Sequence, residues 1–238
     1  MKILLVTGAS SDSGTALLRH IVCRYDLVWA HYRQMNDALM ELYQASPEKI
    51  RLVQADFLKR QDVEAMARII FESRQIPNHI VHFPADKYTL SHFHSTEWEV
   101  YERNLSISVR SAVLLLQRLI PGMIKAGDGR IVFMLSDCTC NSPPACTAHY
   151  TMIKYALLGL VKTLSAEYGK KGIMINGVSP GMMETRFLDE LPGFVREKNA
   201  KERASGKNIE VKELLDVFDL LLFGGCRITG QNIAVEAL

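Results

Sequence analysis

The chain has 238 residues, of which 48% are hydrophobic and 23% charged, and its formal net charge is +2. This balance is typical of a globular protein, and the length fits one α/β domain better than two. Lys and Arg are interspersed with Asp and Glu, so we expect no basic face for nucleic acid and no membrane partner. No stretch approaches the roughly 18 apolar residues of a membrane helix. Five cysteines without framework spacing or a recognisable secretion signal favour reduced thiols in the cytoplasm.

Short apolar runs alternate with amphipathic segments along the chain. The apolar runs predict strands at residues 3–6, 27–30, 50–53, 79–83, 130–135, 174–178 and 232–235. Spacing near 3.6 predicts helices at about 16–22, 63–71, 98–119, 150–168 and 211–223, the third of which ends at Pro121-Gly122. This alternation predicts an α/β fold, a doubly wound, Rossmann-like parallel sheet in three αβα layers, as a single domain over residues 1–238. An irregular stretch at about 182–207 predicts a lid over the site.

A glycine-rich turn follows the first predicted strand and opens the first predicted helix. It reads Thr7-Gly8-Ala9-Ser10-Ser11-Asp12-Ser13-Gly14. Gly8 allows a tight turn, Gly14 allows the helix to approach the sheet, and the helix N-terminus offers N–H groups to a pyrophosphate. Further donors are expected from the hydroxyls of Ser10, Ser11 and Ser13. The turn predicts a dinucleotide site, although a plain strand-to-helix turn would have the same pattern.

The end of the second predicted strand indicates which dinucleotide is bound. The sequence there reads His31-Tyr32-Arg33, with no acid before Asp37. Enzymes that bind NAD usually carry an acid at this point for the ribose hydroxyls, whereas an Arg accommodates the 2′-phosphate of NADP. Arg33 therefore favours NADP(H) as the cofactor, without excluding NAD(H).

Tyr150 and Lys154 are the clearest candidates for catalysis. They are four residues apart in a predicted helix, so the phenol and the ammonium lie on the same face. A nearby cation favours the phenolate and is expected to lower the pKa of the Tyr from its ordinary value near 10. Such a Tyr can give a proton to a carbonyl oxygen. The pattern is common, and a surface pair is the alternative.

With these motifs in place, the chain resembles the short-chain dehydrogenase/reductase family from end to end, and within it the 3-oxoacyl-[acyl-carrier-protein] reductases. Ser136 ends the fifth predicted strand at the family's distance from Tyr150, and Asn104 lies on the preceding long helix. Residues 176–185 match the family's Asn-x-Val-x-Pro-Gly motif followed by Thr. The resemblance implies that this last segment borders the nicotinamide through Pro180, Gly181, Met183 and Thr185.

The resemblance also implies a mechanism, in which hydride passes from the nicotinamide to a carbonyl carbon while Tyr150 acts as the acid. Lys154 would tune Tyr150 and hold the nicotinamide ribose, Ser136 would orient the carbonyl, and Asn104 would anchor a water for proton relay. Asp56 matches the family's adenine-side acid and is followed by Phe57, although a turn-forming Asp is nearly as good an interpretation. The cofactor supplies the difficult chemistry, and the protein supplies position and electrostatics.

Two departures from the family pattern bear on the cofactor. Asp12 stands at the middle glycine of the turn, so its carboxylate must point away from the pyrophosphate, and we expect it to cap the helix. After the fourth predicted strand, the family's Asn-Asn-Ala-Gly is replaced by His82-Phe83-Pro84-Ala85. Pro84 is still expected at the cofactor, but it lacks a backbone donor, so contacts there must differ.

Three cysteines and a histidine cluster before the catalytic helix, at Cys138, Cys140, Cys146 and His149. Their spacing matches no zinc pattern, and we expect the loop that carries them to line the substrate pocket with no metal bound.

Several functions remain open on sequence grounds. The leading hypothesis is an NADP(H)-dependent ketoreductase of fatty-acid or polyketide type that acts on a 3-oxoacyl thioester, with Lys198, Lys201 and Arg203 near an acidic carrier. The alternatives are a reductase of a specialised metabolite or sugar precursor, and a non-catalytic NADP-binding sensor or assembly protein. The resemblance also implies a homodimer or homotetramer built on the 98–119 helix and the Tyr/Lys helix.

Overall fold

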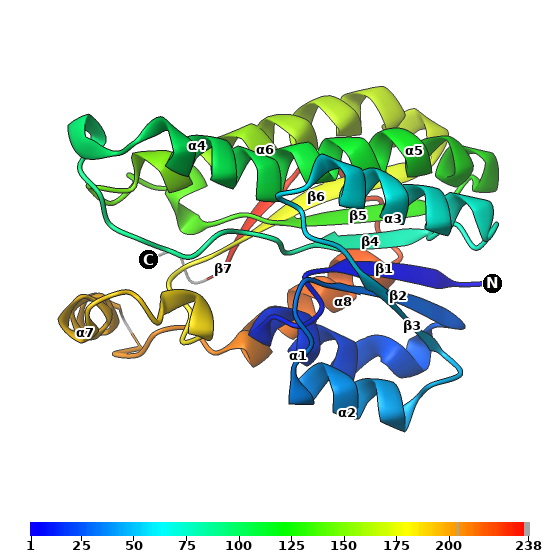
Figure 1. Ribbon diagram of the computed structural model, residues 1–238, viewed down its shortest axis with the longest axis horizontal. Coiled ribbons are helices and arrows are strands. Elements are labelled where there is room, and N and C mark those ends of the chain that lie inside the picture. Colours follow the sequence, from blue (N-terminus) through cyan, green and yellow to red (C-terminus); the bar gives the residue numbers. More distant parts are fainter. Residues whose placement is uncertain (204, 236–238) are drawn as a thin grey trace.

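The computed structural model describes residues 1–203 and 205–235, in which seven parallel strands form one sheet (Figure 1). Ala204, inside the expected lid, and residues 236–238, at the end of the expected domain, lie outside this description. The strand order is β3-β2-β1-β4-β5-β6-β7. The strands are β1 (Ile3–Thr7), β2 (Leu27–Tyr32), β3 (Ile50–Gln54), β4 (His79–His82), β5 (Gly129–Met134), β6 (Ile173–Pro180) and β7 (Asn232–Val235).

Helices cover both faces of the sheet, so the predicted doubly wound, three-layer fold is confirmed (Figure 1). On one face pack α3 (Arg60–Glu72), α5 (Ser111–Ala126) and α6 (Ala148–Tyr168). On the other face pack α1 (Asp12–Ile21), α2 (Asp37–Ala45) and α8 (Leu215–Phe223).

A hydrophobic core lies on each face of the sheet. Each buried strand contributes side chains to both cores, because successive side chains point to opposite faces. In β1, Ile3 and Leu5 join the core under α3 and α5, while Leu4 and Val6 join the core under α1 and α2. All five residues of the strand are buried. A continuous apolar run is therefore what a strand covered on both sides requires.

The predicted 98–119 helix is longer and less regular than expected. It begins with α4 (Trp98–Asn104), passes through a π-helical turn at Leu105–Arg110, and continues as α5. The expected end at Pro121 is wrong, because the exposed proline leaves the packing of buried Met123 intact. The helix ends instead at Gly127, whose φ of 71° forms a left-handed cap.

Residues 98–126 are also long and apolar enough to cross a membrane by composition alone, which the expectation of no such segment did not foresee. Half of the most apolar window is buried inside the fold. Its buried face includes Leu115, Leu116 and Leu119, which pack in the core on one face of the sheet. A core helix of a globular domain passes the same compositional test, and this packing explains its hydropathy.

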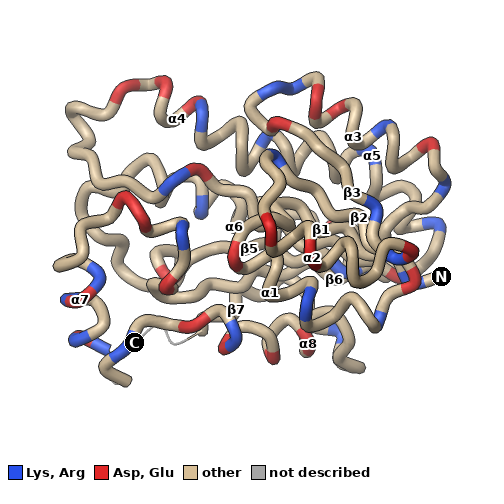
Figure 2. Tube along the Cα trace, turned by 60° about the horizontal axis from the view of Figure 1, so that its bottom comes forward, with Lys and Arg blue, Asp and Glu red and all other residues tan. Residues whose placement is uncertain are grey.

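Two helices were not predicted from the sequence. These are α2 and α7 (Gly193–Glu202), the second of which lies within the expected lid. Basic and acidic residues are interspersed along the chain, α7 included (Figure 2). The chain order of the strands reverses between β1 and β4, and the carboxyl ends of these neighbours define where a ligand binds in such sheets.

Candidate active site

The glycine turn after β1 is held by its own hydrogen bonds. Gly8 has a φ of 75°, which favours glycine, and a Cβ on Gly14 would lie 2.4 Å from the Gly8 carbonyl oxygen. The Ser11 hydroxyl donates to this oxygen at 2.7 Å and accepts from Gly14 N–H at 3.0 Å. Ser11 is therefore the N-cap of α1, and its hydroxyl hydrogen is already used within the turn.

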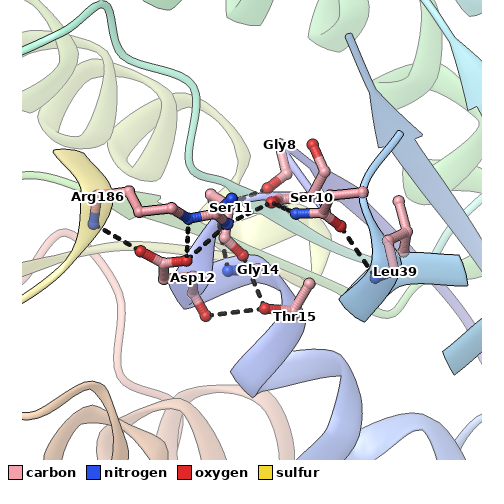
Figure 3. Close-up of polar contacts among 9 residues, drawn as sticks. Gly8, Ser10, Ser11, Asp12, Gly14, Thr15, Leu39 and Arg186 are labelled. Atoms are coloured by element: carbon pink, nitrogen blue, oxygen red, sulfur yellow. Dashed lines mark hydrogen bonds and ion pairs between the residues drawn. The ribbon is translucent and has the colours of Figure 1, made fainter. Parts of the chain in front are cut away.

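Asp12 does not cap the helix, so that expectation is wrong, but its carboxylate does have a positive partner. The Arg186 side chain donates to Asp12 Oδ1 through Nε at 2.7 Å, and the Arg186 backbone N–H donates to Oδ2 at 2.7 Å (Figure 3). The Arg186 guanidinium also reaches the Ser10 carbonyl oxygen at 3.2 Å. Arg186 comes from the segment after β6, which the sequence placed in the lid but did not connect to the glycine turn.

A buried histidine joins the glycine turn to the end of β3. His31 Nδ1 accepts from Gly8 N–H at 3.0 Å, so Nε2 carries the hydrogen and donates to the Ala55 carbonyl at 3.1 Å. Burial lowers the pKa of His31 to about 4, and the ring is neutral near pH 7. Phe57 stacks on it with ring centroids 4.0 Å apart. The role of His31 was not predicted, because nothing in the neighbouring sequence indicates that its ring contacts both Gly8 and Ala55.

Arg33 and Asp56 also line this end of the cavity. Arg33 is exposed at the cavity edge, and none of the acids in residues 1–203 and 205–235 pairs with its guanidinium. Asp56 accepts from Leu58 N–H at 3.0 Å, which is the turn-forming role that the sequence left open.

The altered turn after β4 is also reorganised around a histidine. His82 donates from Nε2 to the Ser108 carbonyl at 2.9 Å and accepts from the Thr7 hydroxyl, also at 2.9 Å. Burial lowers the pKa of His82 to about 3. Phe83 and Pro84 pack against Gly8 and line the cavity. Neutral His82 thus supplies a donor and an acceptor between β1, β4 and the π-helical turn.

Tyr150 and Lys154 project from the first turns of α6 into the same cavity as Ser136. Lys154 Nζ donates to the Met134 carbonyl at 2.8 Å and lies 5.5 Å from the Tyr150 ring centroid. Burial lowers the pKa of Lys154 to about 8.

The Tyr150 hydroxyl differs from expectation in its acidity. Burial raises the pKa of Tyr150 above its ordinary value, and a hydrogen bond with the Ser136 side chain only partly opposes this. The expected lowering by Lys154 is therefore wrong for the protein alone, because desolvation dominates the shift and Lys154 is not among the groups that contribute to it. The hydroxyl stays protonated, which is the form that a proton donor needs.

Asn104, the fourth expected catalytic residue, is buried where α4 meets the π-helical turn. Its Nδ2 donates to the Val100 carbonyl at 2.9 Å. It is not among the residues that line the cavity, so within the described chain the structure brings three of the four together there.

Asp137 is a cavity residue that sequence reasoning missed. Its Oδ1 accepts from the Ser136 hydroxyl at 2.9 Å, and the half-buried carboxylate lies at the cavity wall. The adjacent Cys138 thiol is buried, and burial raises its pKa, so it remains a neutral thiol. Its position directly after Ser136 was the only available signal for Asp137.

The segment after β6 forms an apolar wall on the side of Tyr150. Phe187 and Tyr88 lie against the Tyr150 ring, with centroids 6.0 Å and 4.9 Å from it. Leu188 and Leu191 are buried in the same cluster. The expectation that Arg203 helps to bind an acidic carrier is wrong, because its side chain is buried.

One cavity of about 710 Å³ connects the glycine turn and Arg33 with Ser136, Tyr150 and Lys154. This volume falls within the usual range of ligand pockets. Its polar groups and its close approach to the backbone at Gly8 fit an extended dinucleotide. Of the residues expected at the cofactor, all but Gly14 line it: Gly8, Ser10, Ser11, Ser13, Arg33, Asp56, Phe57, Pro84, Tyr150, Lys154, Pro180, Gly181, Met183 and Thr185.

Comparison with known proteins shows the family of the chain. The sequence model of a family described as Enoyl-(Acyl carrier protein) reductase matches residues 25–237. An uncharacterized oxidoreductase of Bacillus subtilis (strain 168), YmfI, is 26% identical over 247 residues, covering 99% of this chain and 97% of that relative. Dehydrogenase/reductase SDR family member 4 of Mus musculus is 25% identical over 215 residues, or 90% and 75% of the two chains.

Among solved structures, a 3-oxoacyl-[acyl-carrier protein] reductase from Brucella melitensis with bound NAD superimposes with a TM-score of 0.85. It is 22% identical, and the match covers 98% of this chain and 89% of that one. At this identity the likeness shows the fold. With the family match over most of the sequence, it follows that the chain belongs to the short-chain dehydrogenase/reductase family, whose members are oxidoreductases acting on alcohol and carbonyl groups.

Proposed function

We propose that this oxidoreductase reduces a ketone to a secondary alcohol with NADPH. The observation that carries the proposal is one continuous cavity, which runs from Arg33 at the end of β2 to Tyr150 and Lys154 on α6. One extended cofactor can therefore lie between the cationic edge and the proton donor. Arg33 supports NADP(H) over NAD(H), because a guanidinium without an acidic partner suits a phosphate.

The residues at the far end of the cavity have distinct tasks in such a reduction. A bound, reduced nicotinamide supplies the hydride. Tyr150 donates its proton to the carbonyl oxygen, and the Ser136 hydroxyl turns from Asp137 to orient that oxygen. Lys154, whose Nζ is positioned by the Met134 carbonyl, remains charged below a pH of about 8 and stabilises the phenolate that is left. Asn104 stays our candidate for holding a relay water.

The apolar wall of Tyr88, Phe187 and Leu188 supports a substrate with a hydrocarbon portion, such as a 3-oxoacyl thioester. On this proposal the segment at 182–207 acts as the lid. Lys198 and Lys201 are exposed on α7, where they can meet an acidic carrier.

A second candidate substrate is favoured by Asp137, namely a hydroxylated ketone such as a sugar precursor. A carboxylate only accepts hydrogen bonds. A 3-oxoacyl group offers it no donor, whereas a hydroxyl next to the reacting carbonyl would donate to it as Ser136 does.

We also propose a homodimer or homotetramer in the cytoplasm. Trp98 on α4 and Met152 and Tyr155 on α6 are apolar side chains that remain 63%, 41% and 47% exposed. A second copy of the chain would cover them. None of the five cysteines forms a disulfide, which suits a reducing compartment.

The activity is tested by following NADPH oxidation against a panel of a 3-oxoacyl thioester, simple ketones and hydroxyketones, with NADH in parallel. We expect turnover with NADPH, and a 10²- to 10⁴-fold loss in Tyr150→Phe, which is roughly the contribution of a general acid. Bound NADPH with no carbonyl reduced would favour a non-catalytic nucleotide-binding protein.

The two substrate candidates are separated by Asp137→Val. If the substrate donates to Asp137, kcat/KM for hydroxyketones falls about tenfold or more, as expected for a lost hydrogen bond to a charged group. Simple ketones, which lack the donor, serve as the control substrates. An equal loss for all ketones would mean that Asp137 acts only on Ser136.

A further inference from the structure

The negative charge of Asp12 is placed where the proposed cofactor carries its own charge. Asp12 is the first residue of α1 and lines the cavity. The N-terminus of a helix attracts anions, and a diphosphate there would meet the Asp12 carboxylate as a like charge. The site can therefore bind a dinucleotide well only if this carboxylate is neutralised.

Arg186 meets that requirement with several contacts at once. Its Nη2 lies 2.6 Å from Asp12 Oδ1, in addition to the Nε and backbone N–H contacts to the carboxylate and the Nη2 contact to the Ser10 carbonyl (Figure 3). Both carboxylate oxygens are thus occupied by donors from one residue. The pairing with Asp12 raises the pKa of Arg186, so the guanidinium keeps its charge.

Stability alone does not account for this pair. The side chains are 57% and 29% exposed, and exposed ion pairs contribute only about 0–1 kcal/mol to folding. Their location is more informative, because the two residues are 174 positions apart in sequence. Arg186 directly precedes Phe187, which packs against Tyr150. The pair therefore joins the phosphate end of the cavity to its substrate end.

We propose that Arg186 is a positioning residue for the cofactor: it neutralises Asp12, so that an anionic diphosphate can bind, and the same contacts fix the segment after β6 on the glycine turn. This rests on the proposed dinucleotide function. The guanidinium remains on Asp12 and Ser10 when the cofactor binds. Asp12 and Arg186 thus act as a unit, in which losing the cation alone is worse than losing both charges.

The test is a double-mutant cycle with NADPH affinity measured by nucleotide fluorescence in Asp12→Ala, Arg186→Ala and the double variant. We expect Arg186→Ala to weaken binding at least tenfold and Asp12→Ala to bind as tightly as the wild type or tighter. The double variant should return to within about threefold of the wild type. Salt should reduce the loss in Arg186→Ala, since exposed charges are screened. Arg60→Ala, which removes an exposed Arg paired with Glu64 on α3, should leave the affinity unchanged.

Two results would overturn the proposal. A double variant as weak as Arg186→Ala would mean that the guanidinium acts on the diphosphate directly or through the segment that it fixes, and not by neutralising Asp12. Wild-type affinity in Arg186→Ala would mean that the pair has no role in binding.

A second readout needs no nucleotide, and it separates this inference from the proposed function. Hydrogen exchange of the Arg186 amide, whose N–H donates to Asp12, should become faster in Asp12→Ala. If the wild type binds neither NADPH nor NADH, the proposed function falls and the binding role falls with it. Unchanged exchange in a protein that does bind NADPH would instead remove only the proposed fixing of the segment.

Discussion

The proposed function rests on a few residues at the two ends of the cavity. Ser136, Tyr150 and Lys154 could be predicted to meet, because each follows or begins an element whose position the fold dictates. Asp137 and Arg186 could not be assigned from the sequence. The role of Asp137 depends on the place of its carboxylate at the cavity wall, and the Arg186–Asp12 contact spans 174 positions. The direction of the Tyr150 pKa shift was mispredicted for the same reason, since spacing reveals a neighbouring charge but not the loss of solvent.

At this scale, Arg33→Ala tests the cofactor preference. The dissociation constant for NADPH should rise about tenfold, because a charge-assisted contact to the 2′-phosphate is lost. That for NADH should stay nearly constant, because NADH has no such phosphate. The measurement is a titration of both nucleotides against the wild type and the variant. An equal rise in the dissociation constants of the two nucleotides would show that Arg33 does not contact the 2′-phosphate.

Among the elements, strands and long amphipathic helices were predictable, and short polar helices were not. All seven strands were expected because their apolar runs fill two cores. The helix α7 has no buried residue, so it lacks the periodic apolar face that marks a helix in a sequence. The α5 helix extends beyond Pro121 because burial of Met123 outweighs the local signal for an end.

The glycine turn is the element on which the proposed cofactor binding depends most, and Gly14→Ala tests its packing. The added Cβ would lie 2.4 Å from the Gly8 carbonyl oxygen, so the backbone must shift. We expect a loss of about 1–3 kcal/mol in the free energy of unfolding, together with weaker NADPH binding. Gly159→Ala on α6 is the matched control, because its Cβ meets no atom within 4 Å. That change should be neutral or stabilising by up to about 1 kcal/mol. Equal effects of the two substitutions, measured by denaturant unfolding, would contradict the packing argument.

At the scale of the whole molecule, stability should vary with pH because His31, His79 and His82 are buried in the neutral state. Burial lowers the pKa of His31 to about 4 and those of His79 and His82 to about 3, from an ordinary value of 6.5. Below pH 6.5 the unfolded chain binds protons that the folded protein does not bind. Stability is therefore full above about pH 6.5 and falls as the pH decreases toward 4 and below.

By pH 5 each such histidine should cost about 2 kcal/mol of stability, taking 1.36 kcal/mol for each pH unit below 6.5. His82→Asn should flatten the slope of unfolding free energy against pH between 6.5 and 5, whatever its effect on stability at pH 8. His94→Asn, at an exposed position, is the control and should leave the slope unchanged. Denaturant unfolding at several pH values gives the slope for the wild type and for each variant, and identical slopes in all three proteins would show that His82 is not held neutral.

The central claim is that Tyr150 completes a hydride transfer from NADPH to a ketone within this cavity. The most direct measurement supplies NADPH deuterated at the transferred position of the nicotinamide, with the best ketone from the panel, and locates the label by mass spectrometry. We predict deuterium on the carbinol carbon of the alcohol with the wild type, and almost none with Tyr150→Phe at equal nucleotide saturation. An alcohol without the label, or full transfer by Tyr150→Phe, would contradict the account.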